Sequence, residues 1–373
     1  MKRYVCSLLV AVVALALAGL TASAQDTSTQ HPMFKHPVPV YDNAVPPTTA
    51  LQTWNGSFTY QGHNDKFVMV GTDPSATNTS TTVNAYIIPL KVTVTKNGTP
   101  MTFDPATKLS SGLTVTQQVV KSPIFQNLDY NQGGTDIGTT QYEDAFQRGN
   151  FWTNVMTNAN YHVMFKTFVL PEVNLVVPAG DGQTGTTPYG PNKTLGIISY
   201  GWFQQIASKI IAKFPQITPA GVPIFLTYDV YLSETNGFSG CCIGGYHDAY
   251  GNAQSPQTYA QFSFMDQGVG STGIPVFSSD VSALSHEMGE WMDDPYIDNT
   301  QGACGGILEV GDPLEGETQG PDGWGDYTYN LNNYNYHVQD LVFLKYFGQT
   351  PATSVNNWWS FQGETLSVCS NGQ

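Results

Sequence analysis

Basic residues are scarce in this sequence, which limits the partners that we expect it to bind. Lysine and arginine together number 14 against 29 aspartates and glutamates, so the formal net charge of the 373 residues is −15. Such an acidic surface repels phosphate backbones, and we expect no nucleic-acid partner. The charge is compatible with cation binding, although it is also common in exported proteins that must stay soluble.

Long apolar runs are absent beyond the N-terminus. Residues 1–24 place two basic residues ahead of an apolar run and end in the small-residue sequence ASA. This order is typical of a secretory signal peptide, so we expect cleavage after Ala24. No later segment is apolar for long enough to span a bilayer. We therefore expect a secreted protein, extracellular or periplasmic, with no membrane span once the signal is removed; a retained N-terminal anchor is the alternative.

Cysteine is also rare. After the expected cleavage site the chain keeps four cysteines: Cys241, Cys242, Cys304 and Cys369. An even number in an oxidising compartment predicts up to two disulfides. Because neighbouring cysteines rarely bond to each other, we expect bridges from the 241–242 loop to Cys304 and Cys369. No C-x-x-C pair is present, which argues against a thiolate metal site.

No charged or Gly/Ser linker and no internal repeat marks a domain boundary. Residues 25–50 are rich in proline, threonine and glutamine without apolar periodicity, which is typical of an extended leader. Residues 51–138 alternate β-branched and aromatic residues with glycine, asparagine and proline, which predicts short strands and turns. We therefore expect a single α+β domain over residues 51–373 with a β-rich N-terminal portion.

Two later segments have helical periodicity. Large apolar residues recur at helical spacing in residues 139–156, and a second such run covers residues 199–214. Residues 222–233 show an alternation of apolar side chains that is typical of a central strand.

The stretch SALSHEMGEWMDDPYIDN, residues 282–299, carries the strongest chemical signal. It predicts a helix that stops at Asp294-Pro295. On that helix His286 and Glu290 are four residues apart and share a face, as two ligands of one metal must. Glu287 would then lie beside the metal, where a general base for a metal-bound water belongs. The motif is H-E-x-x-E, a variant of the zinc-protease motif H-E-x-x-H.

A third metal ligand must come from elsewhere, because catalytic zinc usually has three protein ligands. The best candidate is Glu309 in GGILEVGDPLEG, and Asp312 three positions later could orient a ligand such as His286. This layout resembles that of gluzincin-type zincins and predicts a zincin-like mixed domain. A carboxylate-rich site should also tolerate Mn²⁺ or Ca²⁺ in place of Zn²⁺.

Other interpretations of these residues stay open. The motif occurs by chance in many helices, where Glu287 and Glu290 would simply form a solvated face. His247 in CCIGGYHDAYG is more often a loop histidine than a ligand. His337 is typical of a structural histidine, although it could replace Glu309 as a ligand. Gly289 inside the helix costs about 1 kcal/mol relative to alanine, which favours a packing or functional reason for it.

Four blocks in fixed order resemble the Exordium, or phosphate-induced protein, family and its bacterial exported relatives. They are GFSGCCIGGYHDAYG, DVSALSHEMGEWMDDPYIDN, LEVGDPLEG and YTYNLNNYNYHVQDLVFLKYF, and together they fall within residues 190–350. The resemblance places the family's His-Glu-x-x-Glu positions on residues 286, 287 and 290 and its acidic segment on Glu309 and Asp312. It also implies a secreted, cell-wall-associated protein.

The sequence therefore predicts a secreted metal-dependent hydrolase, similar to zinc metallopeptidases, that acts on a peptide or protein. The alternative is a non-catalytic extracellular or cell-surface binding protein in which the same acids hold a structural cation. The 20 tyrosines and 7 tryptophans suit contacts with a cell-wall or surface glycan, but they suit a β-rich core equally well.

Overall fold

The structure is a computed structural model, and all the residues that it describes belong to one compact unit, His31–Gln373. The described residues are 34–35, 40–42, 50–60, 62–96, 98–132, 135–150, 155, 158–186, 194–235, 237, 240–266, 279–301, 306–307, 326–339, 341–343 and 358–360. The signal peptide that we expect over residues 1–24 lies outside them.

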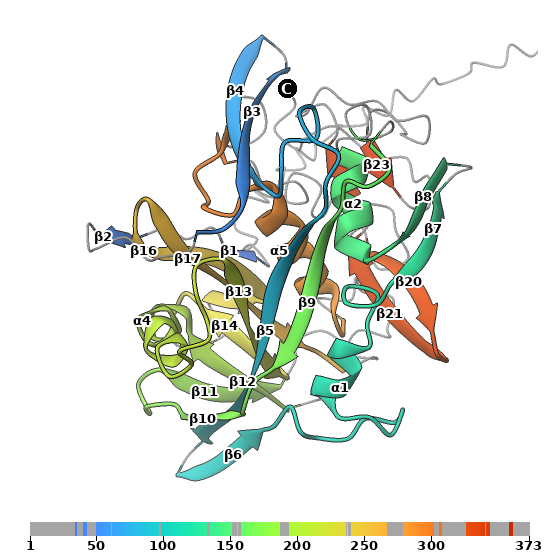
Figure 1. Ribbon diagram of the computed structural model, residues 1–373. Coiled ribbons are helices and arrows are strands. Elements are labelled where there is room, and N and C mark those ends of the chain that lie inside the picture. The colour runs from blue at the N-terminus through green and yellow to red at the C-terminus, as the bar shows by residue number, and fades with distance from the viewer. Residues whose placement is uncertain are drawn as a thin grey trace, which may run out of the picture. The chain divides into compact units, whose positions relative to one another are not determined.

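The elements, labelled as in Figure 1, have the following bounds. The helices are α1 (Val115–Val120), α2 (Tyr142–Asn150), α4 (Tyr200–Ile211) and α5 (Ser282–Asp293). The strands are β1 (Phe34–Lys35), β2 (Val40–Asp42), β3 (Thr53–Tyr60), β4 (His63–Val70), β5 (Thr81–Lys96), β6 (Thr99–Phe103), β7 (Leu128–Gln132), β8 (Thr135–Thr140), β9 (Val163–Val169), β10 (Val173–Val176), β11 (Gly182–Thr186), β12 (Thr194–Ser199), β13 (Gly221–Tyr228), β14 (Val230–Ser233), β15 (Cys241–Ile243), β16 (Gly245–Asn252), β17 (Ser255–Phe264), β18 (Thr300–Gln301), β19 (Gly306–Ile307), β20 (Asp326–Leu331), β21 (Tyr334–Gln339), β22 (Leu341–Phe343) and β23 (Trp358–Ser360).

The expected α+β, zincin-like fold class is wrong. The described residues form 23 strands and only four helices, so the structure is plainly more β than α+β. The physical reason is that the H-E-x-x-E motif specifies one helix and nothing about its surroundings. Most of the remaining chain is rich in β-branched and aromatic residues, which pack well on a pleated surface.

A curled nine-stranded sheet forms the centre of the structure (Figure 1). Its main path runs β1-β16-β17-β13-β5-β10, while β2 pairs with β16, and β6 and β9 pair with β5. The central pairs β5–β13 and β13–β17 are parallel, whereas β16 runs antiparallel to β17. All ten residues of β17 are buried, as expected for a strand that is covered on both faces.

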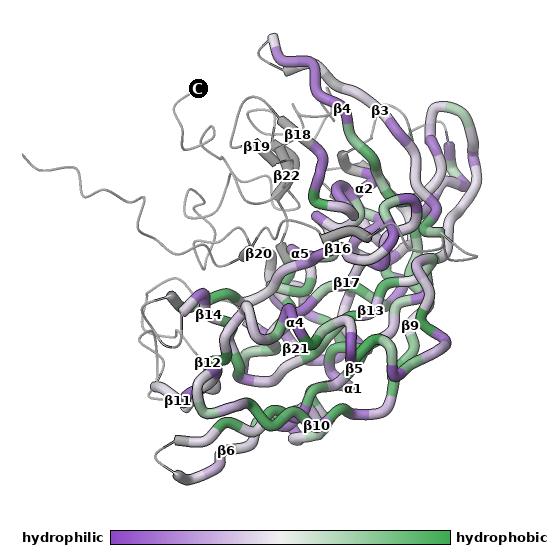
Figure 2. Tube along the Cα trace, turned by 90° about the vertical axis from the view of Figure 1, so that its left-hand side faces the viewer, coloured by the Kyte–Doolittle hydropathy of each residue, from purple (hydrophilic) through white to green (hydrophobic). Residues whose placement is uncertain are grey.

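Two apolar clusters cover the two faces of this sheet. Along β5 the clusters alternate, because successive side chains of a strand point to opposite faces: Ala85 and Ile87 join one cluster, and Tyr86 and Ile88 the other. Helices α2 and α5 supply residues to the first cluster, and α4 to the second. Figure 2 shows the green, hydrophobic stretches along β5, β13 and β17 that these clusters use.

Helix α5 confirms the helix that the sequence predicts around the H-E-x-x-E motif. It ends at Asp293, immediately before Asp294-Pro295, where proline disfavours a helical conformation in the residue before it. All of its 12 residues are buried. The helix packs against β4, β16, β17, β21 and α2, so polar side chains around its whole circumference face protein rather than water.

Candidate metal centre

His286 and Glu290 share one face of α5, as their spacing predicts. The Nε2 atom of His286 lies 3.2 Å from Oε2 of Glu290. Each side chain is only 1% exposed. Glu287 is also only 1% exposed, so the interpretation of Glu287 and Glu290 as a solvated helix face is wrong.

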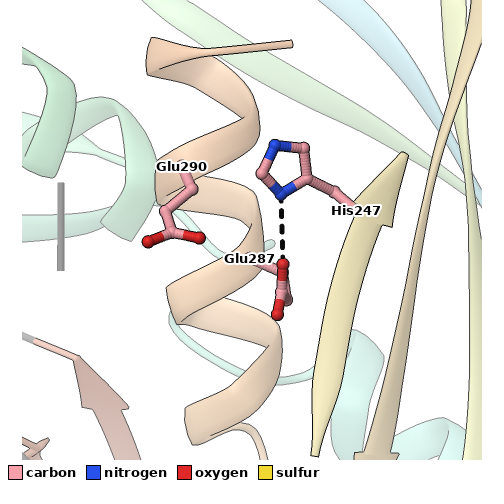
Figure 3. Close-up of side chains that lie close together, drawn as sticks. All are labelled: His247, Glu287 and Glu290. Carbon is pink, nitrogen blue, oxygen red and sulfur yellow. Dashed lines mark hydrogen bonds and ion pairs between the residues drawn. The ribbon is translucent and has the colours of Figure 1, made fainter. Parts of the chain in front are cut away.

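A second histidine reaches α5 from strand β16. The Nδ1 atom of His247 lies 3.1 Å from Oε2 of Glu287, and its Nε2 atom lies 3.1 Å from the carbonyl oxygen of Asp294. His247, Glu287 and Glu290 form the one group of potential ligands found in the described part of the chain, with one ligand atom from each within 4.8 Å of the others. Figure 3 shows these three side chains, the histidine from the strand and both glutamates from the helix.

Gly245 allows α5 to approach β16 this closely. A Cβ atom at this position would lie 2.8 Å from Cγ of Glu287 and 3.0 Å from its Oε1. Gly245 and His247 are two residues apart on one strand, so they face the same side of the sheet. Because Gly245 has no side chain, there is room beside it for the Glu287 carboxylate that His247 contacts.

The hydrogen-bond partners of His247 constrain its protonation. The Asp294 carbonyl can only accept, so Nε2 of His247 carries a proton and donates it there. Nδ1 then faces the Glu287 carboxylate with either a second proton or a lone pair. A lone pair opposite the Glu287 carboxyl group is favourable when that group is protonated and donates its O–H, or when a metal ion binds both side chains. Metal-binding histidines commonly donate their other ring N–H to a backbone carbonyl, as His247 does here.

Acidic groups are concentrated around α5 and shielded from water. The buried carboxyl groups include those of Glu143, Asp280, Glu287, Glu290, Asp293 and Asp294, and none of these six is more than 1% exposed. Burial raises the pKa of Glu143 well above its ordinary value; the charge of Asp293 raises it further, and His286 lowers it. Burial also raises the pKa of Asp293. A buried carboxylate is costly unless it binds a proton or a cation, so this region favours cation binding.

The structure brings together only part of the predicted site. Glu287 and Glu290 lie in the three-residue group, together with His247, which the sequence identifies only as a weaker candidate. His286 contacts Glu290 but is not in that group. Glu309 and Asp312 lie outside the described residues.

His337, the other weaker candidate, lies on β21 and contacts a different acid. Its Nδ1 atom is 2.7 Å from Oδ2 of Asp280, and its backbone N–H donates to Oδ1 of the same residue. Asp280 precedes α5, so this contact ties β21 to the start of the helix.

Glu143 lies beside the candidate site but outside every motif that the sequence contains. This residue lies in α2 and is completely buried beside α5. Its neighbours in the sequence are mostly polar, so no sequence signal marks it as a buried acid.

Cys241 and Cys242 lie in close contact with each other at the start of β15. The expected bridges from the 241–242 loop to Cys304 and Cys369 stay a prediction. These two expected partners lie outside the described residues.

Comparisons with known proteins give no match: no family model, no curated protein and no solved structure corresponds to this chain. Separately, no helix in the described part of the chain has the length and apolar character that a bilayer crossing requires.

Proposed function

We propose that this protein is a secreted, metal-dependent hydrolase of the zinc-metallopeptidase type, with His247, Glu287 and Glu290 as the metal-binding residues. The observation that carries the proposal is the approach of these three buried side chains to within 4.8 Å, two of them from the H-E-x-x-E helix. One nitrogen and two carboxylate donors form a ligand set that zinc accepts.

The donor set also suits hydrolysis. A bound zinc ion would polarise a carbonyl group and lower the pKa of a water molecule. The chain's own residues would orient the site: His247 is fixed by the Asp294 carbonyl, and Glu290 by its contact with His286. Glu287 contacts His247 and, as a member of the three-residue group, would bind the metal in place of acting as the general base that its position in the motif predicts.

The cellular location and the substrate class in this proposal come from the sequence. The signal-like N-terminus supports export to an extracellular or periplasmic location, and a peptide or protein is the proposed substrate. The resemblance to the Exordium family stays a prediction. Ca²⁺ is the alternative metal, because two of the three donors are carboxylates.

A second candidate function is supported by the burial of the three side chains. Each is about 1% exposed, and structural metal sites are closed whereas catalytic ones keep an open position. In that case the protein is a non-catalytic binding protein, with a glycan as a possible partner, and the cation stabilises its fold.

Zinc titration of the mature, metal-free protein tests the site. We expect zinc binding in the wild type and an affinity that is at least about 10-fold lower in His247→Gln, because a ligand is lost. His63→Gln is the matched control, since His63 is exposed on β4. Zinc binding by His247→Gln that equals the wild type would refute the assignment.

Glu287→Gln then separates the two functions. Loss of peptide hydrolysis with zinc retained would identify Glu287 as the base of an enzyme. Loss of zinc would make Glu287 a ligand. If zinc raises the thermal stability of the protein but the protein hydrolyses no member of a peptide library, the result would favour a structural cation.

A further inference from the structure

Strand β16, which carries His247, lies near one edge of the central sheet. Strand β17 pairs with one side of β16 along its whole length, at eight positions. Among the described strands, the partners on the other side of β16 are β1 and β2, which are two and three residues long (Figure 1). The outer side of the strand that carries His247 is therefore paired with two short strands from the N-terminal part of the chain.

The two N-terminal strands pair with β16 on either side of His247. Strand β1 pairs with residues 245–246 and strand β2 with residues 250–252, both in parallel. Four residues, 36–39, separate β1 from β2, but only three residues of β16, 247–249, separate their partners. A regular ladder does not continue across such a difference in length.

The sequence of this N-terminal segment limits how strongly it can pair with β16. Pro37 and Pro39 fall between β1 and β2, and proline has no backbone N–H to donate to a ladder. An edge strand offers its backbone groups to any chain that can add a strand. A peptide with a longer uninterrupted strand can therefore compete with β1 and β2 for this edge.

Burial explains why β16 needs a partner on its outer side. Residues 245–249 are buried, and buried backbone N–H and C=O groups are costly when they are unpaired. An extended peptide would satisfy these groups by adding a strand about 4.8 Å from β16. Its carbonyl groups would then lie one strand spacing from the backbone of His247, a candidate ligand of the proposed metal centre.

We propose that the outer edge of β16 is the binding surface for an extended peptide substrate and that β1 and β2 occupy it as an autoinhibitory segment. Proteolytic removal or displacement of this segment frees the edge. The inference rests on the proposed function in one respect, namely that the bound peptide is the substrate of the His247 site. The 1% exposure of His247, Glu287 and Glu290 fits a form in which this edge is filled.

The test compares one protein before and after cleavage. A recognition sequence for a site-specific protease is inserted between Thr49 and Ala50 of the mature chain, and the purified, metal-free protein is cleaved and separated from its N-terminal fragment. Fluorescence anisotropy measures the binding of a labelled synthetic peptide, HPMFKHPVPVYD, which has the sequence of residues 31–42. A tethered segment at an effective concentration of about 1 mM competes with a peptide whose dissociation constant is about 0.1 mM, so cleavage should raise the apparent affinity about 10-fold.

The matched control is the same peptide with N-methyl groups on the backbone of residues 40–42. It keeps the side chains but loses the N–H donors of β2, so its affinity for the cleaved protein should be at least about 10-fold lower. If the cleaved protein does not stay folded by circular dichroism, uncleaved protein with Val40→Pro and Tyr41→Pro replaces it. Successive residues of a strand direct their N–H groups to opposite sides, so one of these prolines removes a donor toward β16. This variant should bind the peptide more tightly than the uncleaved wild type.

The outcomes separate this inference from the proposed function. Equal peptide affinity before and after cleavage overturns the inference, and so does equal affinity of the N-methylated and unmodified peptides. Zinc binding that is insensitive to His247→Gln, together with peptide binding that depends on cleavage, overturns the metal assignment alone. Hydrolysis of a peptide library by the zinc-loaded cleaved protein, and not by the uncleaved protein, would support both.

Discussion

Replacing Gly289 by alanine should destabilise the protein, although the same change in most helices is stabilising. Alanine is favoured over glycine in a helix by about 1 kcal/mol. At this position, however, the new Cβ atom would lie 3.0 and 3.2 Å from two ring atoms of Phe146 and 3.4 Å from Oε2 of Glu143. Forcing an extra carbon into a packed site costs about 1–3 kcal/mol. The two contributions together predict that the free energy of unfolding falls by about 0–2 kcal/mol.

Gly201→Ala in α4 is the matched control. A Cβ atom there would meet only Oγ of Ser199, at 3.9 Å, so nothing opposes the helix propensity of alanine. We expect this variant to gain about 0.4–1 kcal/mol. Urea unfolding of both variants in the presence of a chelator measures the difference without a contribution from bound metal.

Phe146→Leu should relieve the crowding, because leucine lacks the ring atoms that meet the new methyl group. The double variant with Gly289→Ala should therefore be more stable than the two single effects predict, by about 0.5–2 kcal/mol. If Gly289→Ala is as stabilising as Gly201→Ala, α2 and α5 do not approach as closely as described.

Three further predictions concern the surroundings of the proposed metal. Gly245→Ala should displace Glu287, because the new Cβ lies 2.8 Å from its Cγ; zinc affinity should fall, and unchanged affinity in calorimetry would argue against Glu287 as a ligand. Asn299→Ala should cost about 2–4 kcal/mol in urea unfolding, because the Asn299 side chain bonds both backbone groups of Val68 and the carbonyl of Asp293; a loss below about 1 kcal/mol would contradict this role. With free zinc 100-fold above its dissociation constant, the free energy of unfolding should be about 3 kcal/mol higher than it is after a chelator has removed the metal. An unchanged thermal midpoint would show that no such ion is bound.

The sequence determines the local parts of the candidate site. Helical spacing in SALSHEMGEWM places His286 and Glu290 on one face, and Asp294-Pro295 ends the helix. It also predicts that Gly289 has a reason to be there, which the close approach of Phe146 confirms. These features follow from periodicity and backbone stereochemistry, which act over a few residues and leave a direct mark in the sequence.

Only the tertiary structure decides which distant residues meet this helix. His247 reaches Glu287 across 40 positions because β16 pairs antiparallel with β17, beneath α5. Glu143 meets the opposite face because α2 packs there. The expected zincin-like fold class is wrong for the same reason, since one helix does not specify the sheet that covers it. Burial is likewise a collective property: the charges of α5 resemble a solvated face in the sequence, and the surrounding strands and helices turn them into a buried candidate metal site.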